Sequence, residues 1–339
     1  MTVPVSVVLG IDVGGTKTNA TVLNDLGEFL IDRMIEVPSR VQEGPDAAIE
    51  AIRSVVVAVL AEAGLEFGDV RAIGLDTPGP ASAEGVISQR GATNFAQREW
   101  WGFNVRSAVE AAMHLPVIYN NDGNAAALFA HQEHYGIDAA HRSSISAIVG
   151  TGLGGGVIEG GRIVRGVTGM AGELGHVHIP MGGFLQPGQP LPHCNCGFDA
   201  DLESVASLSG IMNNLLPYWL TQYPAHPLAG QPISDAAKAV RGYAQRGDEM
   251  ALKIFEQQAA AIGCMFTIAA NFTDPDAYFV GGGVVEAEPH FRDWFLERVS
   301  QHTQLREEQR AVAEFLVVPD LDMAGARGSA MAALNAIRP

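Results

Sequence analysis

Short runs of consecutive apolar residues alternate along this chain with stretches in which apolar residues recur every three or four positions. The first pattern is typical of buried strands and the second of amphipathic helices, so the sequence predicts an α/β protein. Val5–Ile11 is the first apolar run, and it ends at Asp12. A second β-rich run, Asn19–Leu23, follows closely and predicts a hairpin. The turn between the two runs contains Gly14, Gly15, Thr16 and Lys17.

Helical spacing is clearest in Pro45–Ala63, which begins with a proline and is followed by Gly64. Proline at the first position and glycine after the last are typical helix boundaries. The other strands that the pattern predicts are a third one after the turn 24–27, and Val70–Leu75, Val117–Tyr119, Ile145–Val149, Gly156–Glu159, Ile163–Val164, Tyr278–Val280 and Phe315–Val318. The other helices are Ala108–Met113, Ala125–Tyr135, Leu202 to about Trp219, Asp235–Arg246, Glu249–Asn271, Phe291–Ser300 and Gly328–Ala336.

The turn of the first hairpin suits a phosphate group. Glycine lets the backbone approach a ligand closely, and free N–H groups there attract anions. For this turn alone, a plain glycine-rich hairpin is the alternative interpretation. The run Val149–Val157 repeats the design in the second half of the chain, with Thr151 and Gly152 in its turn. At Gly15 and Gly152 we expect either a positive φ or backbone that touches phosphate.

Two strand–turn–strand units of one type resemble the two phosphate hairpins of the actin-like sugar kinases. The remaining motifs resemble the ROK family (repressors, open reading frames and sugar kinases), in the family's order and over essentially the whole chain. These motifs are Pro78-Gly79-Pro80, Asn94-Phe95, Asn121-Asp122, Gly172-Glu173-Leu174-Gly175-His176, Cys194-x-Cys196 with Glu203, and Gly281-Gly282-Gly283.

The resemblance implies a two-domain actin-like (ribonuclease H-like) α/β fold of the sugar kinase type, with a cleft between the domains. We expect an N-terminal α/β domain over residues 1–118, completed by a C-terminal helix in 325–339. The C-terminal α/β domain is expected over residues 119–324.

Composition excludes several classes of protein. The chain has 339 residues, of which 47% are hydrophobic and 17% charged, so it can form two globular cores. Its net charge of −17 argues against a protein that binds the nucleic-acid backbone. The three cysteines are too few for a disulfide framework. Neither a signal peptide nor a membrane-spanning run is visible, so we expect a cytoplasmic protein that binds no membrane.

Asp122 is the first candidate for catalysis. A carboxylate where a strand gives way to a helix lies near the positive end of the helix dipole, which favours its ionised form. An ionised Asp can accept the proton of a hydroxyl during phosphoryl transfer. The structural alternative is a helix cap, a role that Asn121 could share. The resemblance favours catalysis, because the matching Asp in ROK kinases is the general base.

Clustered acids, amides and imidazoles suit sugar recognition, since each sugar hydroxyl both donates and accepts hydrogen bonds. Glu173 and His176 share one short segment, and Glu203 begins the next predicted helix. Alternatively, Glu203 is only an acidic first-turn residue and His176 a satisfied histidine. The resemblance implies that the sugar is bound by Asn94, Asn121, Asp122, Glu173, His176 and Glu203.

Cys194 and Cys196, together with His176, indicate a structural zinc site. The family has a third cysteine where this chain has Asp201, and the gap from His176 to Cys194 is longer here by about the length of Gly182–Pro192, an expected exposed loop. Asp201 is either the fourth zinc ligand or a cap of the helix that begins near Leu202.

The resemblance also assigns the nucleotide. Asp12 and the Thr151 turn would handle phosphates and Mg²⁺, which prefers a few carboxylates, substrate phosphates and water. Gly282 and Gly283 would let adenosine lie against the backbone. The complete set of residues that we expect to bind ATP is Asp12, Gly14, Gly15, Thr16, Lys17, Thr151, Gly152, Gly282 and Gly283.

The function implied is ATP-dependent phosphorylation of a hexose, in the first place the 6-hydroxyl of glucose. Kinases of N-acetylglucosamine, N-acetylmannosamine, fructose and mannose share these motifs, and some relatives accept polyphosphate. A sugar-responsive repressor and a non-catalytic sugar-binding protein are the rival classes. The family's usual state predicts a homodimer.

Overall fold

The computed structural model describes residues 6–89 and 93–338. It contains two compact units, the first made of Met1–Ala139, Gly161–Gly172 and Pro319–Pro339, and the second of Ala140–Gly160 and Glu173–Val318. This division groups α3, Asp122–Tyr135, with the first unit, whereas the expected boundary after residue 118 assigned it to the second. Val5, the expected start of the first strand, lies outside the described residues.

The first unit is built on a five-stranded mixed sheet of order β3-β2-β1-β4-β5. Its strands are β1 (Val7–Val13), β2 (Lys17–Asn24), β3 (Ile35–Pro38), β4 (Val70–Thr77) and β5 (Val117–Asn121). β1 and β2 form the expected antiparallel hairpin, while β1, β4 and β5 run parallel. The carboxyl ends of β1, β4 and β5 therefore meet at one edge, where α/β proteins place ligands.

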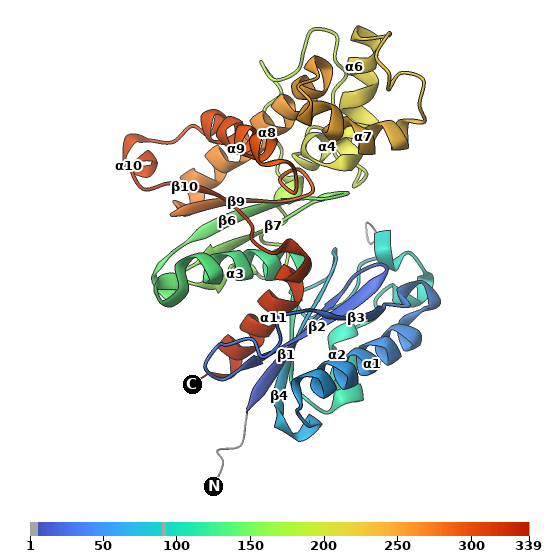
Figure 1. Cartoon of the computed structure of the whole chain (residues 1–339), viewed down its shortest axis with the longest axis vertical. Helices are drawn as coiled ribbons and strands as arrows, with labels where there is room; N and C mark the ends of the chain where they lie inside the picture. The colour runs from blue at the N-terminus through green and yellow to red at the C-terminus, as the bar shows by residue number, and fades with distance from the viewer. Residues whose placement is uncertain (1–5, 90–92, 339) are drawn as a thin grey trace. The chain divides into compact units, whose positions relative to one another are not determined.

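Successive side chains of β1 point to opposite faces of the sheet and so belong to two different cores. Val7, Leu9 and Ile11 pack in a core with α1 (Pro45–Ala63) and α2 (Val105–Met113). Val8 faces the other way, toward Ala330 and Ala333 of α11 (Leu321–Ile337). Figure 1 shows α11, in red, against this sheet.

Glycines bring α11 unusually close to the strands. A Cβ at Gly10 would collide with the carbonyl of Ala326, and one at Gly74 with the carbonyl of Ser329. Neither glycine has a positive φ, so close packing and not backbone conformation is the reason for glycine at both positions.

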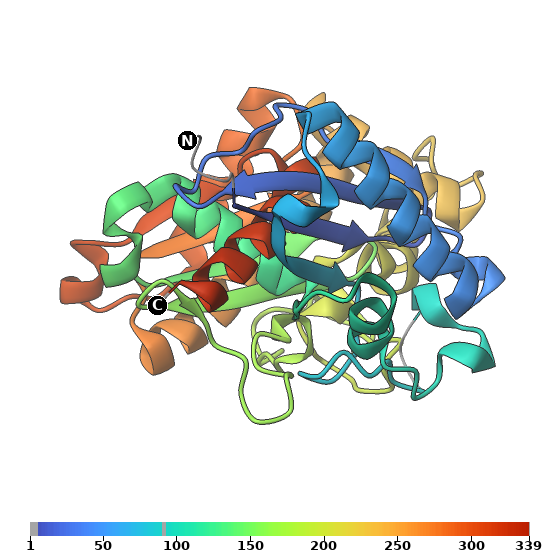
Figure 2. The same ribbon diagram turned by 90° about the horizontal axis from the view of Figure 1, so that it is seen from below.

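The second sheet has the order β10-β9-β6-β7-β8. Its strands are β6 (Ser144–Val149), β7 (Leu153–Glu159), β8 (Arg162–Ile163), β9 (Ala277–Gly282) and β10 (Glu314–Val317). β6 and β7 form the second hairpin, and β6, β9 and β10 run parallel. The second unit's helices, visible in Figures 1 and 2, are α4 (Glu203–Ala206), α5 (Leu208–Gly210), α6 (Leu216–Gln222), α7 (Ile233–Gln245), α8 (Glu249–Thr273), α9 (Pro289–His302) and α10 (Glu307–Arg310).

Two elements differ from the prediction. The helix expected from Leu202 to Trp219 is interrupted at Ser207, whose φ of −133° and ψ of 169° are extended. The Ser207 hydroxyl accepts from Gly210 N at 2.8 Å and so caps α5, which explains the break. The third strand begins only at Ile35, and Phe29 forms merely an isolated bridge with Leu23.

The loop 182–192 is mostly exposed, as expected, but it is tied down at Gln189. This side chain is buried and accepts from Gln257 Nε2 of α8 at 2.8 Å. Within the described residues, no helix is long and apolar enough to cross a lipid bilayer.

Candidate active site

The turn of the first hairpin is closed by a hydrogen bond from Gly14 N to Lys17 O at 2.9 Å. Lys17 Nζ lies 2.8 Å from both carboxylate oxygens of Glu36, and both side chains are exposed. Thr16 is exposed at the tip of the turn, and its carbonyl accepts from Ser39 N. The ammonium of Lys17 is thus already paired, which leaves the backbone as the part of the turn that suits a phosphate.

Gly15 has no positive φ, so the expectation of a left-handed backbone at this position is wrong. A Cβ at Gly15 would instead lie 2.5 Å from Oδ1 of Asn94. Asn94 belongs to a single 3₁₀ turn, Thr93–Phe95, and its carbonyl accepts from Gln42. A side chain at position 15 would therefore press on the end of the Asn94 side chain, an expected sugar-binding amide.

Asp12 and Asp76 are neighbours on the parallel strands β1 and β4. Asp76 is fully buried, its Oδ2 accepts from Ser329 Oγ at 2.7 Å, and its Oδ1 accepts from no group of the described residues. Asp12 accepts from Asn19 Nδ2 at 3.3 Å. Burial, followed by the negative charge of Asp12, raises the pKa of Asp76 well above its usual range, and burial also raises the pKa of Asp12.

Asn121 and Asp122 are adjacent at the start of α3 and occupy different helix positions. Asn121 is the N-cap, and its Oδ1 accepts from Gly123 N at 2.9 Å. Asp122 is the first helical residue, partly buried, and its Oδ1 accepts from the same N–H at 2.7 Å. Because Asn121 performs the capping, the carboxylate of Asp122 is not required for it.

The second hairpin also has a glycine turn, which is one residue shorter than the first. Gly150 N donates to Gly152 O at 2.9 Å, and the carbonyls of Gly150 and Thr151 accept from the backbone of Leu208 and Ser209 at 3.0 Å. Thr151 is exposed at the tip. The start of α5 therefore holds this turn through two backbone hydrogen bonds.

Glu203 joins the second hairpin to the cysteine loop. Its Oε2 accepts from Leu153 N at 2.8 Å, and its Oε1 accepts from Cys194 Sγ at 3.4 Å. Gly152 has no positive φ either, and a Cβ there would lie 2.5 Å from Glu203 Oε2. Both turn glycines thus make room for an expected sugar-binding side chain.

Glu173 and His176 flank a 3₁₀ turn, Leu174–His176. A Cβ at Gly175 would lie 2.5 Å from the carbonyl of Leu153, so this turn packs against the second hairpin through glycine. Burial raises the pKa of Glu173, an effect that His176 opposes and Glu203 reinforces.

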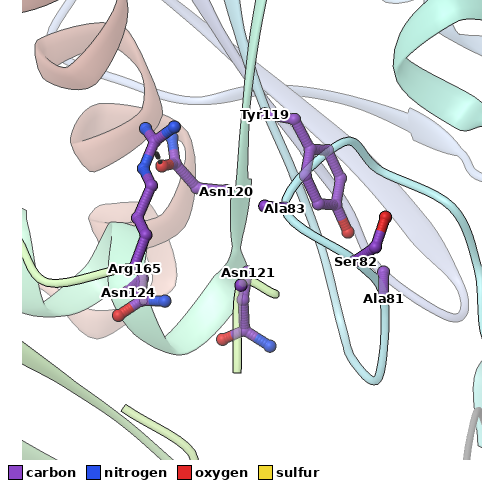
Figure 3. A pocket seen from close by; sticks show the side chains of 9 residues that line it. Ala81, Ser82, Ala83, Tyr119, Asn120, Asn121, Asn124 and Arg165 are labelled. Carbon is purple, nitrogen blue, oxygen red and sulfur yellow. Dashed lines mark hydrogen bonds between the residues drawn. The ribbon is translucent and has the colours of Figure 1, made fainter. Parts of the chain in front are cut away.

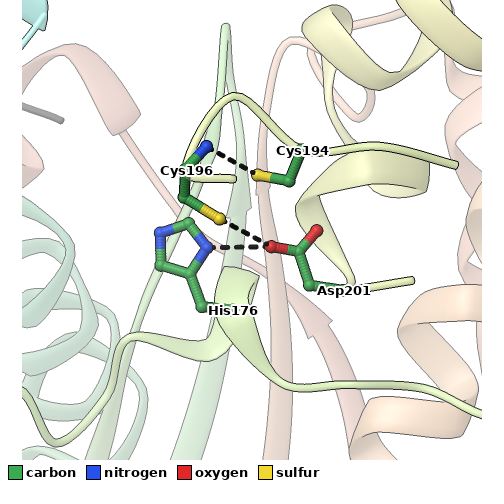
Figure 4. A group of neighbouring side chains, drawn as sticks. All are labelled: His176, Cys194, Cys196 and Asp201. Carbon is green, nitrogen blue, oxygen red and sulfur yellow. Dashed lines mark hydrogen bonds and ion pairs between the residues drawn. The ribbon is translucent and has the colours of Figure 1, made fainter. Parts of the chain in front are cut away.

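Four expected metal ligands converge in the second unit. The ligand atoms of His176, Cys194, Cys196 and Asp201 all lie within 4.8 Å of one another. Figure 4 shows the four side chains, with one imidazole nitrogen turned toward the group and the other away from it. An imidazole, two thiols and a carboxylate are the donors that zinc takes in four-coordinate sites, so the set fits this metal.

Asp201 is both a potential ligand and a cap. Its Oδ1 accepts from Ser204 N at 2.9 Å in the first turn of α4, while its Oδ2 lies 3.0 Å from His176 Nδ1 and accepts from Cys196 Sγ at 3.4 Å. Burial acts to raise the pKa of Asp201, but the hydrogen bonds from His176 and Ser204 outweigh it and lower the pKa. The two interpretations made from the sequence are therefore compatible.

The glycine run at the end of β9 packs on the second hairpin. Gly282 has a φ of 90°, and a Cβ there would collide with the carbonyl of Val149. Gly283 N donates to Val149 O at 3.0 Å, and Gly283 O accepts from Arg241 of α7. This is a turn that only glycine adopts easily.

Several polar residues near these groups were not identified from the sequence as site residues. They are Asn19, Ser329, Asn120, Arg165 and Arg241, each hydrogen-bonded to an expected site residue or its neighbour. Asp76 was noted in the sequence without a role. No short motif contains these residues, because the fold brings them from elements that are distant in sequence.

Two α/β units with mixed sheets, each containing one glycine-turn hairpin, define the two-domain actin-like sugar kinase fold. The profile of the ROK family matches residues 8–336. The chain belongs to the ROK family.

Three relatives support this assignment. A glucokinase from Halalkalibacterium halodurans is 32% identical over 311 residues, which are 88% of this chain and 89% of the relative. The crystal structure of the ROK hexokinase from Thermus thermophilus has a TM-score of 0.76 and 30% identity over 98% of this chain and 99% of its own. A ROK glucokinase from Streptomyces griseus in complex with glucose and AMPPNP has a TM-score of 0.70 and 27% identity over 97% of this chain and all of its own.

Proposed function

We propose that this protein is an ATP-dependent hexose kinase that phosphorylates glucose on its 6-hydroxyl. The observation that carries the proposal is Asp122, a carboxylate at the start of α3 whose capping role is already filled by Asn121. The similarity to glucokinases supports the choice of glucose. N-acetylglucosamine, N-acetylmannosamine, fructose and mannose are the alternative substrates.

Asp122 would accept the proton of the attacking hydroxyl as the phosphoryl group arrives. The sugar ring would be held by Asn94, Asn121, Glu173, His176 and Glu203. The close packing of Asn94 on Gly15 and of Glu203 on Gly152 supports this role, because it fixes both side chains beside the hairpin turns. Such fixed positions favour reaction by keeping the sugar in one orientation.

The nucleotide's phosphates would contact the backbone of the two turns, Gly14–Lys17 and Gly150–Gly152. The pairing of Lys17 with Glu36 argues for backbone N–H groups and not the ammonium as the donors. Asp12 would hold Mg²⁺ through water, and the ion supplies charge neutralisation on the phosphates when bound. Gly282 and Gly283 would adjoin adenosine.

A zinc ion held by His176, Cys194, Cys196 and Asp201 would have a structural role. The cluster connects the 3₁₀ turn that carries His176 with the cysteine loop and the start of α4, where Glu203 lies. Metal would therefore order two expected sugar ligands, so its loss should lower activity and stability together.

Metal analysis of protein purified without chelator tests the zinc site. We expect about one zinc per chain, much less in Asp201→Ala, and no loss in the control Asp199→Ala, which removes an exposed carboxylate bound to His193. Because Asp201 also caps α4, Asp201→Asn separates the roles: it keeps the capping oxygen and should still lose zinc. Zinc retained in both Asp201 variants would make this residue a cap only.

The activity is tested with a panel of hexoses and a coupled assay of ADP release. We expect turnover with ATP, the highest kcat/KM with glucose, and almost none in Asp122→Asn. Polyphosphate is the second donor to test. A protein that binds sugars but turns over none of them with either donor would instead be a sugar-binding regulator.

The compartment and the oligomeric state are inferred from the sequence and the family alone. We keep the cytoplasm and a homodimer as predictions, which fractionation of the source cells and light scattering of the purified protein can check.

A further inference from the structure

A small pocket in the first unit lies at the carboxyl end of β5, and of its lining residues only Asn121 has a role in the proposed mechanism. Its walls come from segments far apart in the sequence: 81–83, the end of β5 with the start of α3, and 165–169. Ala83 N donates to Thr168 O at 2.9 Å, and Gly169, with a φ of 88°, packs on Ala83. The pocket thus has a defined rim, and Figure 3 shows Asn120, Asn124 and Arg165 along one side of it.

Two amides that line this pocket are buried and only partly satisfied. Asn120 accepts from Arg165 Nη2 at 2.7 Å, but its own Nδ2 donates to no group in the described chain. Asn124 likewise has an Oδ1 without a donor. Asn120 and Asn124 are only 4% and 5% exposed, and an unsatisfied buried polar group costs about 1–3 kcal/mol. A ligand that supplies both an acceptor and a donor would remove this cost.

Arg165 brings a positively charged side chain to the lining of the pocket. Arg165 is partly buried, and its printed hydrogen bond is made to a neutral amide, that of Asn120. Burial, followed by the nearby charge of Arg106, lowers the pKa of Arg165, and the carboxylate of Glu84 acts in the opposite direction. Arg106 itself is paired with Glu84 and Glu110, so Arg165 is the cation left for a ligand. Guanidinium binds phosphate and carboxylate oxygens in particular.

We propose that this pocket binds the anionic oxygen group of a small hydroxylated molecule, a phosphate or a carboxylate. Arg165 and Asn120 Nδ2 would donate to the anionic oxygens, and Asn124 Oδ1 would accept from a hydroxyl. Asn121, one of the residues expected to bind sugar, also lines the pocket, so the proposed anion site adjoins the expected sugar site and shares this residue with it. A phosphorylated sugar and free phosphate are two sources of the same chemistry. The proposal goes beyond the kinase activity and does not depend on it.

A purely structural role for Arg165 is the rival interpretation. In that case its hydrogen bond to Asn120 only fastens the segment 165–169 to β5. Removing Arg165 would then lower stability and leave the affinity for anions unchanged.

Isothermal titration of the full-length protein, without nucleotide and at fixed ionic strength, tests the proposal. The probes are inorganic phosphate, glucose 6-phosphate, glucuronate and glucose. Arg165→Gln keeps a hydrogen-bond donor near Asn120 but removes the charge, and we expect it to weaken anion binding by about tenfold or more. The control is Arg142→Gln, which removes an arginine paired with Asp276 in the second unit. It should bind the anions as the unmutated protein does.

Asn120→Asp is the second variant, because it keeps the oxygen that accepts from Arg165 but replaces the free donor by a repelling charge. It should abolish anion binding while the fold, checked by the melting temperature, is retained. If inorganic phosphate binds, the phosphate group alone is sufficient for binding to the pocket. If only glucose 6-phosphate or only glucuronate binds, the pocket requires an anion that also carries sugar hydroxyls. Equal affinity in Arg165→Gln and unmutated protein, or binding of none of the three anions, would overturn the proposal. The affinity for glucose should not change in Arg165→Gln. All of these measurements are of binding, so none of them requires catalytic turnover.

Discussion

Asp122 and Asn121 occupy adjacent positions but have different partners. The Asn121 side chain closes the helix start, and Asp122 accepts from the same Gly123 N–H. In Asp122→Asn the amide oxygen can keep that hydrogen bond, but the side chain cannot take a proton. We therefore expect kcat to fall by about 10²–10⁴-fold while sugar still binds. Steady-state kinetics and direct titration of glucose measure the two effects.

Asn121→Asp is a useful comparison with this variant, because it replaces the side chain that caps α3 and leaves Asp122, the proposed general base, in place. Asp is as good a cap as Asn, so the helix should be retained. Near-normal turnover in Asp122→Asn would remove the general-base role, whatever Asn121→Asp does.

The neighbouring carboxyl groups of Asp12 and Asp76 predict a dependence of stability on pH. The folded-state pKa of Asp76 is raised by burial and then by Asp12, so the folded protein binds more protons than the unfolded one between the two pKa values. The free energy of unfolding must therefore fall as the pH rises from about 4, the ordinary pKa of Asp, through the raised value.

Asp76→Asn should reduce this fall and leave only the part that comes from the raised pKa of Asp12. The amide cannot ionise, so relative to the unmutated protein the variant gains stability as the pH rises, and urea unfolding at a series of pH values measures it. Asp25→Asn, which alters an exposed carboxylate, is the control for the change in net charge. A constant difference between Asp76→Asn and the unmutated protein at every pH contradicts the prediction.

The sequence identified residues whose chemistry is expressed in a local motif. Asp122 beside Asn121, or Cys194 beside Cys196, can be found because the partner residue is a neighbour in the chain. Asp76 with Ser329 could not be interpreted, since the two are 253 positions apart and only the packing of α11 on β4 brings them together. The same holds for Arg165 and Asn120.

At the scale of elements, the hairpin turns give a prediction that differs from the original expectation. Gly152 does not have a positive φ, and its missing Cβ makes room for Glu203, which accepts from Leu153 N. Gly152→Ala should therefore displace the Glu203 carboxylate and raise the KM for glucose by about tenfold or more, with a smaller effect on the KM for ATP.

Gly150→Ala is a matched control in the same turn, because the nearest atom to its added Cβ would be 3.9 Å away. The KM for glucose should stay close to that of the unmutated protein. If Gly152→Ala raises the KM for ATP alone, the turn touches phosphate and Glu203 is not displaced.

Elements were predicted well where one physical signal was sufficient. Helix α1 has the predicted bounds, because its apolar spacing, Pro45 and Gly64 all agree. The stretch that begins at Leu202 was misread as one helix, since the apolar residues continue in helical spacing through the break. The break depends on a capping hydroxyl, Ser207, and serine is common enough within helices that its presence there carried no signal.

At the scale of the whole molecule, the first unit is completed by the end of the chain. The face of its sheet that carries Val8, Gly10 and Gly74 is covered by α11, which follows β5 by 200 residues in sequence (321 against 121). The unit's stability should therefore depend on contacts that no segment before residue 321 can make.

Gly74→Ala tests this dependence. Its Cβ would overlap the carbonyl of Ser329, so α11 must move away from β4 and the buried Asp76–Ser329 hydrogen bond must lengthen. We expect the free energy of unfolding to fall by about 1–3 kcal/mol or more, as for other overpacked cores. Gly68→Ala, which adds the same atom where nothing lies within 4 Å, should change it by only about 0.5 kcal/mol. Equal stability of the two variants in urea unfolding would mean that α11 is not packed on β4 in this way, because a methyl group has no room at Gly74 unless the helix is displaced.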